Sequence, residues 1–378
     1  MNQKGISEKE VLSVLNAARQ KDTSYEKVLS AMCTMPHPVA VKAHLQFIES
    51  NLGDFGLFPG TKELEDKVIR IMGDLLGDSQ ACGYITTGGT ESNLQALRAA
   101  RNLSGKKRPN FVVPTSAHFS FDKIGDLLGM EIRKAGLDKD FRVDIGSVED
   151  LIDENTVALV GIAGSTEFGS IDPVDKLADI ASSHDLFLHI DAAFGGFVIP
   201  FLDKKYDFDF SVSGVTSITA DPHKMGMSTI PAGGLLFKEE SCLLPLEINT
   251  PYLTIKAQHS LTGTRSGAAV AAAYAVMTHL GREGYRKIVT RCMGMTRRLV
   301  EGAGEFGIEP LIDPVMNIVA LDVPDLDEVR KELRGKGWFT SITRTPRAMR
   351  ILVMPHLKEE TLELFISDLG ACAGRTYR

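Results

Sequence analysis

Two residues in the middle of the sequence have the types and spacing needed for covalent amine chemistry. Lys224 lies in the segment DPHK, just after the apolar run Thr216–Ala220, and Asp191 ends the apolar run Leu186–Asp191. A lysine at the end of a buried strand loses proton affinity through desolvation and can attack an aldehyde as a nucleophile. Considered alone, Lys224 is more simply interpreted as a charged residue exposed to solvent, and Asp191 as a residue that caps a turn. At the ends of successive strands, however, both side chains can reach one ligand.

Two further segments are expected at the same edge of the predicted sheet, where the strands before Asp191 and Lys224 end. The sequence TTGGTESN (86–93) leads from a strand through two glycines into a helix, and His118 follows the strand Phe111–Pro114. The glycines allow close backbone approach, and the free N–H groups of a helix N-terminus attract phosphate. The spacing differs from that of a Walker A loop and of a G-x-G-x-x-G turn. A phosphate cradle, a ring to stack, an acid for a ring nitrogen and an amine for an aldehyde together describe a pyridoxal 5′-phosphate site.

The elements that must position these residues alternate between short apolar strands and helices. This pattern predicts an α/β fold with a mostly parallel central sheet, helices on both faces and polar residues at the carboxyl edge. We predict an N-terminal helical arm (1–60), a large α/β domain (61–280) and a small C-terminal α+β domain (281–378). The expected strands are Gly83–Thr87, Phe111–Pro114, Val157–Ala163, Leu186–Asp191, Thr216–Ala220 and Gly233–Phe237, followed by apolar runs at Asn317–Val323 and Met349–Met354. The expected helices are Glu91–Arg101, Val174–Ser183, Gly267–His279, Asp325–Arg334 and Glu359–Leu369, with another that begins at the N-cap Thr61. A second helical stretch is expected after Gly267–His279.

Composition excludes several classes of protein. The 378 residues are 43% hydrophobic and 24% charged, which is ordinary globular usage. A net charge of −7 without blocks of like charge argues against nucleic acid as a partner. No run of apolar residues is long enough to span a bilayer, and the polar N-terminus differs from a secretory signal. Five cysteines without a C-x-x-C pair indicate reduced thiols, so we expect a cytoplasmic protein.

A metal site is not expected from the sequence. Cys33, His37 and His44 lie close together, but their spacing, with no second cluster, does not match a zinc site.

The chain resembles the group II amino-acid decarboxylases, which are pyridoxal-phosphate enzymes of fold type I. Within that family it is most similar to the archaeal L-tyrosine/L-aspartate decarboxylases. The likeness extends from about residue 30 to residue 357, and it implies the fold-type I transferase fold and a homodimer with shared active sites. The matching segments are MCTMPHP, NLGDFGLFPGTKELE, TTGGTESNL, HIDAAFGGFVIPF, GVTSITADPHKMG, SLTGTRSG and MRILVMPH.

The resemblance implies a role for each matching position. Lys224 corresponds to the lysine that bonds to the cofactor, Asp191 to the partner of the ring nitrogen, and His118 to the histidine stacked on the ring. Arg350 corresponds to an arginine that binds the substrate carboxylate. The other implied cofactor contacts are Gly89 and Thr90 in the phosphate loop, Thr166 near the cofactor, Ala193 on the second face of the ring, His223 near the phosphate, and Thr264, which would reach the phosphate of the neighbouring subunit.

The implied reaction is decarboxylation of an L-amino acid. Tyrosine, giving tyramine for methanofuran, is expected slightly ahead of aspartate, giving β-alanine for coenzyme A. Aspartate needs a second cation in the site, whereas tyrosine needs an apolar slot with one polar group for the phenol. The candidate residues are Arg265, Arg344 and Arg347 for the cation, and Phe55, Leu57 and Phe58 for the slot.

Three other functions are compatible with parts of the sequence. The GTRSG segment and the region around Lys224 also resemble sphingosine-1-phosphate lyases, although those enzymes generally carry a membrane anchor. A transferase or a tRNA-linked enzyme of the same fold is the second alternative. The tRNA-linked enzyme would be expected to show a basic face, which a net charge of −7 without clustered Lys or Arg disfavours. A non-catalytic cofactor-binding protein is disfavoured because both Lys224 and Asp191 are present.

Overall fold

The structure, a computed structural model, describes residue 1 and residues 3–374. Its central sheet has seven strands: β1 (Cys82–Thr86), β2 (Asn110–Pro114), β3 (Glu131–Ala135), β4 (Thr156–Ile162), β5 (Phe187–Asp191), β6 (Ser217–Ala220) and β7 (Gly233–Phe237). Their order across the sheet is β1-β7-β6-β5-β4-β2-β3. All pairs from β3 to β6 are parallel, and only β7 runs antiparallel to its two neighbours. The predicted α/β fold with a mostly parallel sheet is confirmed.

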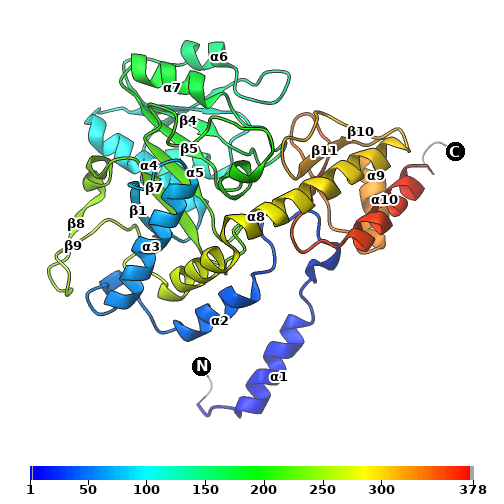
Figure 1. Cartoon of the computed structure of the whole chain (residues 1–378), viewed down its shortest axis with the longest axis horizontal. Coiled ribbons are helices and arrows are strands. Elements are labelled where there is room, and N and C mark those ends of the chain that lie inside the picture. Colours follow the sequence, from blue (N-terminus) through cyan, green and yellow to red (C-terminus); the bar gives the residue numbers. More distant parts are fainter. Residues whose placement is uncertain (2, 375–378) are drawn as a thin grey trace.

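Helices cover both faces of this sheet (Figure 1). One face packs against α3 (Pro59–Leu75), α7 (Val174–Ser183) and the first part of α8 (Gly267–Gly304), and the other face against α4 (Gly89–Ser104) and α5 (Ser120–Leu128). The short helix α6 (Ile145–Asp150) precedes β4. Buried residues on both faces explain why the strands are continuous apolar runs.

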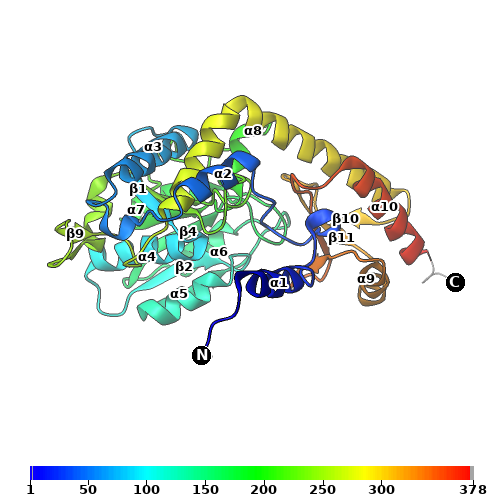
Figure 2. The ribbon, with the colours of Figure 1, turned by 90° about the horizontal axis from the view of Figure 1, so that it is seen from below.

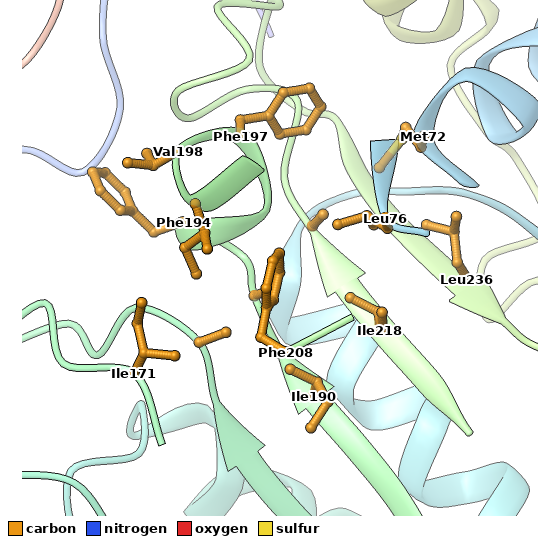
Figure 3. Packing of buried hydrophobic residues seen from close by; sticks show 14 of the residues in the cluster. Met72, Leu76, Ile171, Ile190, Phe194, Phe197, Val198, Phe208, Ile218 and Leu236 are labelled. Atoms are coloured by element: carbon orange, nitrogen blue, oxygen red, sulfur yellow. The ribbon is translucent and has the colours of Figure 1, made fainter. Parts of the chain in front are cut away.

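Two hydrophobic clusters form because successive side chains of a strand point to opposite faces. In β2, Val112 belongs to one cluster and its neighbours Phe111 and Val113 to the other. Figure 3 shows part of the first cluster, in which Ile190 and Ile218 lie on neighbouring strands.

The parallel register brings the carboxyl ends of the central strands to one edge. Ile162 at the end of β4 lies beside Asp191 at the end of β5, which lies beside Thr219 of β6. Residues that follow these positions therefore emerge next to one another, as ligand-binding residues do in open α/β sheets.

A second, four-stranded antiparallel sheet lies in the C-terminal part of the chain. Its strands are β11 (Ile318–Asp322) and β13 (Met349–Leu352) at the centre, with β10 (Glu309–Pro310) and β12 (Ser341–Ile342) at the edges. Helices α9 (Leu326–Gly335) and α10 (Glu359–Ala373) pack with it around a separate hydrophobic cluster.

Helix α8 connects the two sheets, as Figure 1 shows. Its first part joins the core of the large sheet, and Met295 and Leu299 of its second part join the core of the small sheet. The helix is interrupted at Gly281, where φ is +56°, a value that glycine tolerates better than other residues. The expected domain limits at 60 and 280 remain a prediction, and the second limit falls beside this interruption.

The N-terminal arm contains α1 (Glu8–Arg19) and α2 (Pro38–Gln46) with the short 3₁₀ turns η1 (Tyr25–Lys27) and η2 (Leu52–Asp54). Helix α1 has no buried residue and extends away from the rest of the chain (Figures 1 and 2). After it, Val28 pairs with Phe339 beside the small sheet, and α2 packs against α8. The arm thus runs from the small sheet to the large one.

One local expectation is wrong and one element was missed. Thr61 is not an N-cap, because α3 already begins at Pro59, whose fixed φ suits the first helical turn. Strand β3 was not expected. The expected helix Gly267–His279 and the helical stretch after it are both found, as the two parts of α8 on either side of Gly281. The remaining short elements are β8 (Ile248–Asn249), β9 (Ala257–Gln258), η3 (Gly195–Phe197), η4 (Ile199–Phe201), η5 (Glu240–Cys242) and η6 (Leu244–Leu246). None of the helices described is long and apolar enough to cross a membrane.

Candidate active site

A cavity of about 350 Å³ opens at the carboxyl edge of the large sheet, between the ends of β4, β5 and β6 and the N-terminus of α4. Eight of the ten site residues expected from the sequence line it. They are Gly89, Thr90, His118, Thr166, Asp191, Ala193, His223 and Lys224. Arg350 and Thr264 do not line the cavity in this chain.

The amine of Lys224 lies against a carboxylate that the sequence analysis did not assign to the site. Its Nζ is 3.1 Å from Oδ2 of the buried Asp221. Burial by itself would lower the pKa of Lys224, but the carboxylates of Asp221 and Asp191 more than offset it, so the pKa is raised. The expected net loss of proton affinity at Lys224 is therefore not found, because two acids lie close to its amine.

Both carboxylate oxygens of Asp191 accept hydrogen bonds. Its Oδ1 accepts a hydrogen bond from the backbone N–H of Ala193 at 3.1 Å, and its Oδ2 accepts one from Nδ2 of Asn93 at 2.9 Å. The side chain lines the cavity and is only 7% exposed. Asp191 can therefore present a carboxylate of fixed orientation to a ligand.

The start of α4 has the properties of a phosphate cradle. Gly88, with φ +145°, precedes the helix and supplies no side-chain cap, and the cavity is lined by Gly88 and by the first helical residues Gly89 and Thr90. A Cβ at Gly89 would lie 3.0 Å from Asp221 and 3.2 Å from Ala193, so the backbone approaches closely only because this residue is glycine. The backbone N–H of Gly89 donates to Asp221 Oδ2 at 3.1 Å.

The two histidines of the cavity are partly engaged by backbone. Nδ1 of His223 accepts from the N–H of Ala232 at 3.1 Å, which leaves Nε2 as the protonated nitrogen of a neutral ring, 3.7 Å from Asp221. Burial lowers the pKa of His118 and of His223. His118 Nδ1 accepts from Ser120 N–H at 3.3 Å, and its ring packs on Phe119. Neutral rings at the cavity wall suit stacking on a flat ligand.

Arg350 lies directly behind the cavity wall. From β13, its Nε donates to the backbone oxygen of Thr166 at 2.5 Å, and its Nη2 contacts Met32 Sδ at 2.8 Å. Thr166 and Met32 both line the cavity. Burial lowers the pKa of Arg350 to about 10, so the guanidinium remains charged at neutral pH.

The residues considered for the substrate side chain lie elsewhere in this chain. Arg265 forms a buried ion pair with Glu65 at 2.5 Å, while Arg344 pairs with Glu167 and Arg347 with Asp327. Phe55 lines a different cavity of about 440 Å³ beside Arg265. Leu57 is 63% exposed, and neither Leu57 nor Phe58 lines the 350 Å³ cavity. Thr264 is exposed.

The family model for the pyridoxal-dependent decarboxylase conserved domain matches residues 28–320. The chain belongs to this family. The described residues fit the cofactor, since a partly buried amine, a fixed carboxylate and a glycine-lined helix N-terminus meet in one cavity. The expectation of pyridoxal phosphate as cofactor is confirmed, and the chain is a pyridoxal-phosphate-dependent decarboxylase of amino acids.

Close relatives of this decarboxylase carry names with stated substrates. It is 58% identical to the probable L-tyrosine/L-aspartate decarboxylase of Methanosarcina acetivorans, with 98% of each chain covered. It is 55% identical to the probable L-aspartate decarboxylase of Archaeoglobus fulgidus, with 95% of this chain and 98% of the relative covered.

Solved structures share the fold. The sphingosine-1-phosphate lyase of Burkholderia pseudomallei has a TM-score of 0.91 at 28% identity, with 99% of this chain and 92% of that chain covered. The glutamate decarboxylase of Lactobacillus brevis has a TM-score of 0.90 at 21% identity, with 98% of this chain and 93% of that chain covered, which shows the fold alone.

Three residues at the site were not identified from the sequence. Asp221 contacts the amine of Lys224, Asn93 lines the cavity and donates to Asp191, and His189 contacts Asn93. All three stand inside segments that the sequence analysis singled out, namely DPHK, TTGGTESN and LFLHID. Their position in those segments could have identified them as site residues, but sequence spacing alone does not show which side chains contact each other.

Proposed function

We propose that this enzyme decarboxylates L-tyrosine to tyramine in preference to L-aspartate to β-alanine, as a cytoplasmic enzyme of methanofuran and coenzyme A biosynthesis. The names of its close relatives support both substrates, and its five free cysteines agree with a reducing compartment. Bound pyridoxal phosphate supplies an aldehyde for the lysine amine and a ring that accepts the electrons left when carbon dioxide departs.

The residues of the chain have distinct tasks in this proposal. The Lys224 amine bonds to the cofactor, the Asp191 carboxylate pairs with the ring nitrogen, and His118 stacks on one ring face opposite Ala193. The remaining cofactor contacts are Gly89, Thr90 and His223 around the phosphate, and Thr166 near the ring. Their joint presence in one cavity supports these assignments.

The observation that carries the substrate proposal is the environment of Arg350. Among the residues described, no carboxylate lies within ion-pair distance of its guanidinium, and the nearby Glu167 is engaged by Arg344. Its Nη2 contacts the thioether of Met32, which is a weak acceptor. A substrate carboxylate that displaces Met32 gains a charge-assisted bond to a buried cation.

The cavity wall favours tyrosine over aspartate. Its apolar lining includes Met32, Ile162, Phe194 and Ile230. The basic residues among the described lining positions are Lys224, His118 and His223, which the cofactor occupies in this proposal. A second carboxylate would thus need a cation from outside the described cavity.

The proposal is tested by measuring carbon dioxide release from L-tyrosine, L-aspartate and L-glutamate under identical conditions. We expect tyrosine to give the largest kcat/KM, followed by aspartate, with glutamate much slower. Release from glutamate alone would contradict the substrate assignment. The similarity to a sphingosine-1-phosphate lyase makes a phosphorylated amino alcohol the fourth substrate, and aldehyde release from it without any carbon dioxide would contradict decarboxylation.

The variant Arg350→Met tests, in the same experiment, whether Arg350 binds the α-carboxylate of the substrate. Since the α-carboxylate is common to every amino acid, this variant should raise KM about tenfold or more for each accepted substrate. Its cofactor content should stay normal because Arg350 lies behind the wall.

We further propose that the active unit is a homodimer in which Thr264 reaches the cofactor phosphate of the neighbouring subunit. Thr264 and Gly263 are exposed, and a Cβ at Gly263 would meet no atom within 4 Å. The side-chain positions of Gly263 and Thr264 are therefore open to another chain. The same arrangement would bring Phe55, Leu57 and Phe58 of one chain toward the substrate side of the other.

Mixed dimers test this arrangement. Thr264→Glu would place a negative charge against the phosphate, so it should weaken cofactor binding at least about tenfold, and Lys224→Ala should be inactive. Co-expressed, the two variants should recover about a quarter of wild-type activity, because half of the dimers are hybrids with one intact site. Thr264→Ser should resemble the wild type. Full activity of Thr264→Glu alone, or no recovery in the hybrid, would contradict a shared site.

A further inference from the structure

Three buried polar side chains continue in a line from Asp191, and only the first of them, Asn93, also lines the cavity. Asn93 of α4 donates from Nδ2 to Asp191 Oδ2 at 2.9 Å, and its Oδ1 lies 3.0 Å from Nε2 of His189 in β5. Nδ1 of His189 lies 2.7 Å from the hydroxyl of Ser217 in β6. Asn93, His189 and Ser217 are each no more than 1% exposed.

The direction of every bond in this line follows from the carboxylate at its end. An ionised carboxylate only accepts hydrogen bonds, so Asn93 must turn its amide nitrogen toward Asp191 and its oxygen toward His189. That oxygen also only accepts, so His189 must carry its proton on Nε2. Nδ1 is then an acceptor, and the hydroxyl of Ser217 must donate to it.

A neutral His189 agrees with its surroundings. Burial lowers the pKa of His189 to about 4, despite the neighbouring Asp191. Among the described contacts of Nε2, the other side-chain oxygen is the hydroxyl of Thr219. At 3.4 Å from Nε2 it is too far for a strong hydrogen bond. At Nε2, the oxygen of Asn93 is therefore the strong acceptor among the described contacts.

We propose that Asn93, His189 and Ser217 are positioning residues, which lock the Asp191 carboxylate in the orientation that pairs with the cofactor ring nitrogen. This inference rests on the proposed role of Asp191. Asn93 donates directly to the carboxylate, while His189 and Ser217 act through Asn93 by preventing its amide from turning over. Because all partners are buried, a turned amide would set an oxygen against the carboxylate with no water to compensate.

The first test reads the tautomer of His189 in the wild-type apoprotein by ¹⁵N nuclear magnetic resonance. We expect Nε2 to be protonated, Nδ1 to be bare, and the ring to stay neutral down to about pH 5. An Nδ1-protonated or cationic ring at neutral pH would overturn the inference. This measurement needs neither substrate nor cofactor, so it decides the inference even if the proposed amino acids are not turned over.

The second test compares buried asparagines. Asn93→Ala should lower kcat by about 10- to 100-fold, as loss of supporting hydrogen bonds does at metal ligands, with little change in KM and a shifted absorbance spectrum of the bound cofactor. Asn110→Ala is the matched control, because Asn110 is equally buried and donates to Asp153 at 2.7 Å at the opposite end of the sheet. It should lose thermal stability without the spectral shift. Identical behaviour of the two variants would overturn the inference.

Substitutions of His189 separate positioning from packing. His189→Gln retains a side-chain amide that can donate to Asn93, whereas His189→Leu retains bulk without a donor. We expect His189→Gln to recover much of the kcat and the normal cofactor spectrum that His189→Leu loses. Equal loss in both variants would show that the imidazole only fills space. If neither variant folds, the tautomer of the wild type still decides.

Discussion

Replacing Lys224 with alanine should lower decarboxylation at least about a thousandfold, as removal of a covalent nucleophile does in other enzymes. Lys224 is the one lysine among the described residues that line the cavity, so no second amine can take its place there. Borohydride treatment of the wild type should fix the cofactor to the peptide that contains Lys224 and bleach the yellow colour. Mass spectrometry of the digested protein measures both the attachment and its position.

Lys176→Ala is the control for this prediction. Lys176 lies on the surface between Asp175 and Asp179, and its removal should change neither colour nor turnover. A Lys224→Ala protein that still carries the reduced cofactor on another lysine would show that the assignment is wrong.

Replacing Asp191 with asparagine should leave cofactor bound but reduce kcat about 10²- to 10³-fold, because a fixed charge that stabilises the electron-rich ring is lost. Asparagine keeps the shape of the side chain, but its NH₂ group cannot accept the bond from Asn93 or from Ala193 N–H. The absorbance of the bound cofactor should change together with kcat. Unchanged turnover would mean that Asp191 only ends its strand.

Asp172→Asn is the matched substitution at a second buried carboxylate. Asp172 accepts backbone hydrogen bonds from Val143 and Ile162 at 2.7 Å and does not line the cavity. This variant should lose stability and keep the cofactor spectrum. A spectral change as large as that of Asp191→Asn would mean that the effect is not specific to the ring partner.

The central strands could be predicted because burial on both faces leaves a direct trace in the sequence. All six expected strands begin and end within about one residue of β1, β2, β4, β5, β6 and β7. Strand β3 has the sequence EIRKA and lies at the sheet edge, where it pairs on one side only and exposes polar residues. No apolar pattern marks such a strand. Thr61 was misplaced because Pro59 provides an equally good helix start.

The cavity could be predicted where a residue's position depends only on its own strand. Parallel strands bring their ends to one edge, so Asp191, Lys224 and His118 had to be neighbours. The contact between Asp221 and Lys224 depends on a turn, and the contact between Asn93 and Asp191 on how α4 crosses the sheet. The position of Arg350 beside the cavity depends on how the second sheet packs against the first. Sequence spacing contains none of these distances.

The two sides of the active site have separate structural origins, and this has a consequence for how the enzyme can diversify. Apart from Thr264, the groups assigned to the cofactor lie on α4, at the end of β5 or on segments that follow strands of the large sheet, whereas Met32 and Arg350 come from the N-terminal arm and the small sheet. Substitutions in these outer parts can alter which amino acid is accepted while leaving the cofactor apparatus intact. Selection for a new substrate can therefore act on few positions without first damaging catalysis, and laboratory evolution is best directed at residues 28–34 and at the neighbours of Arg350.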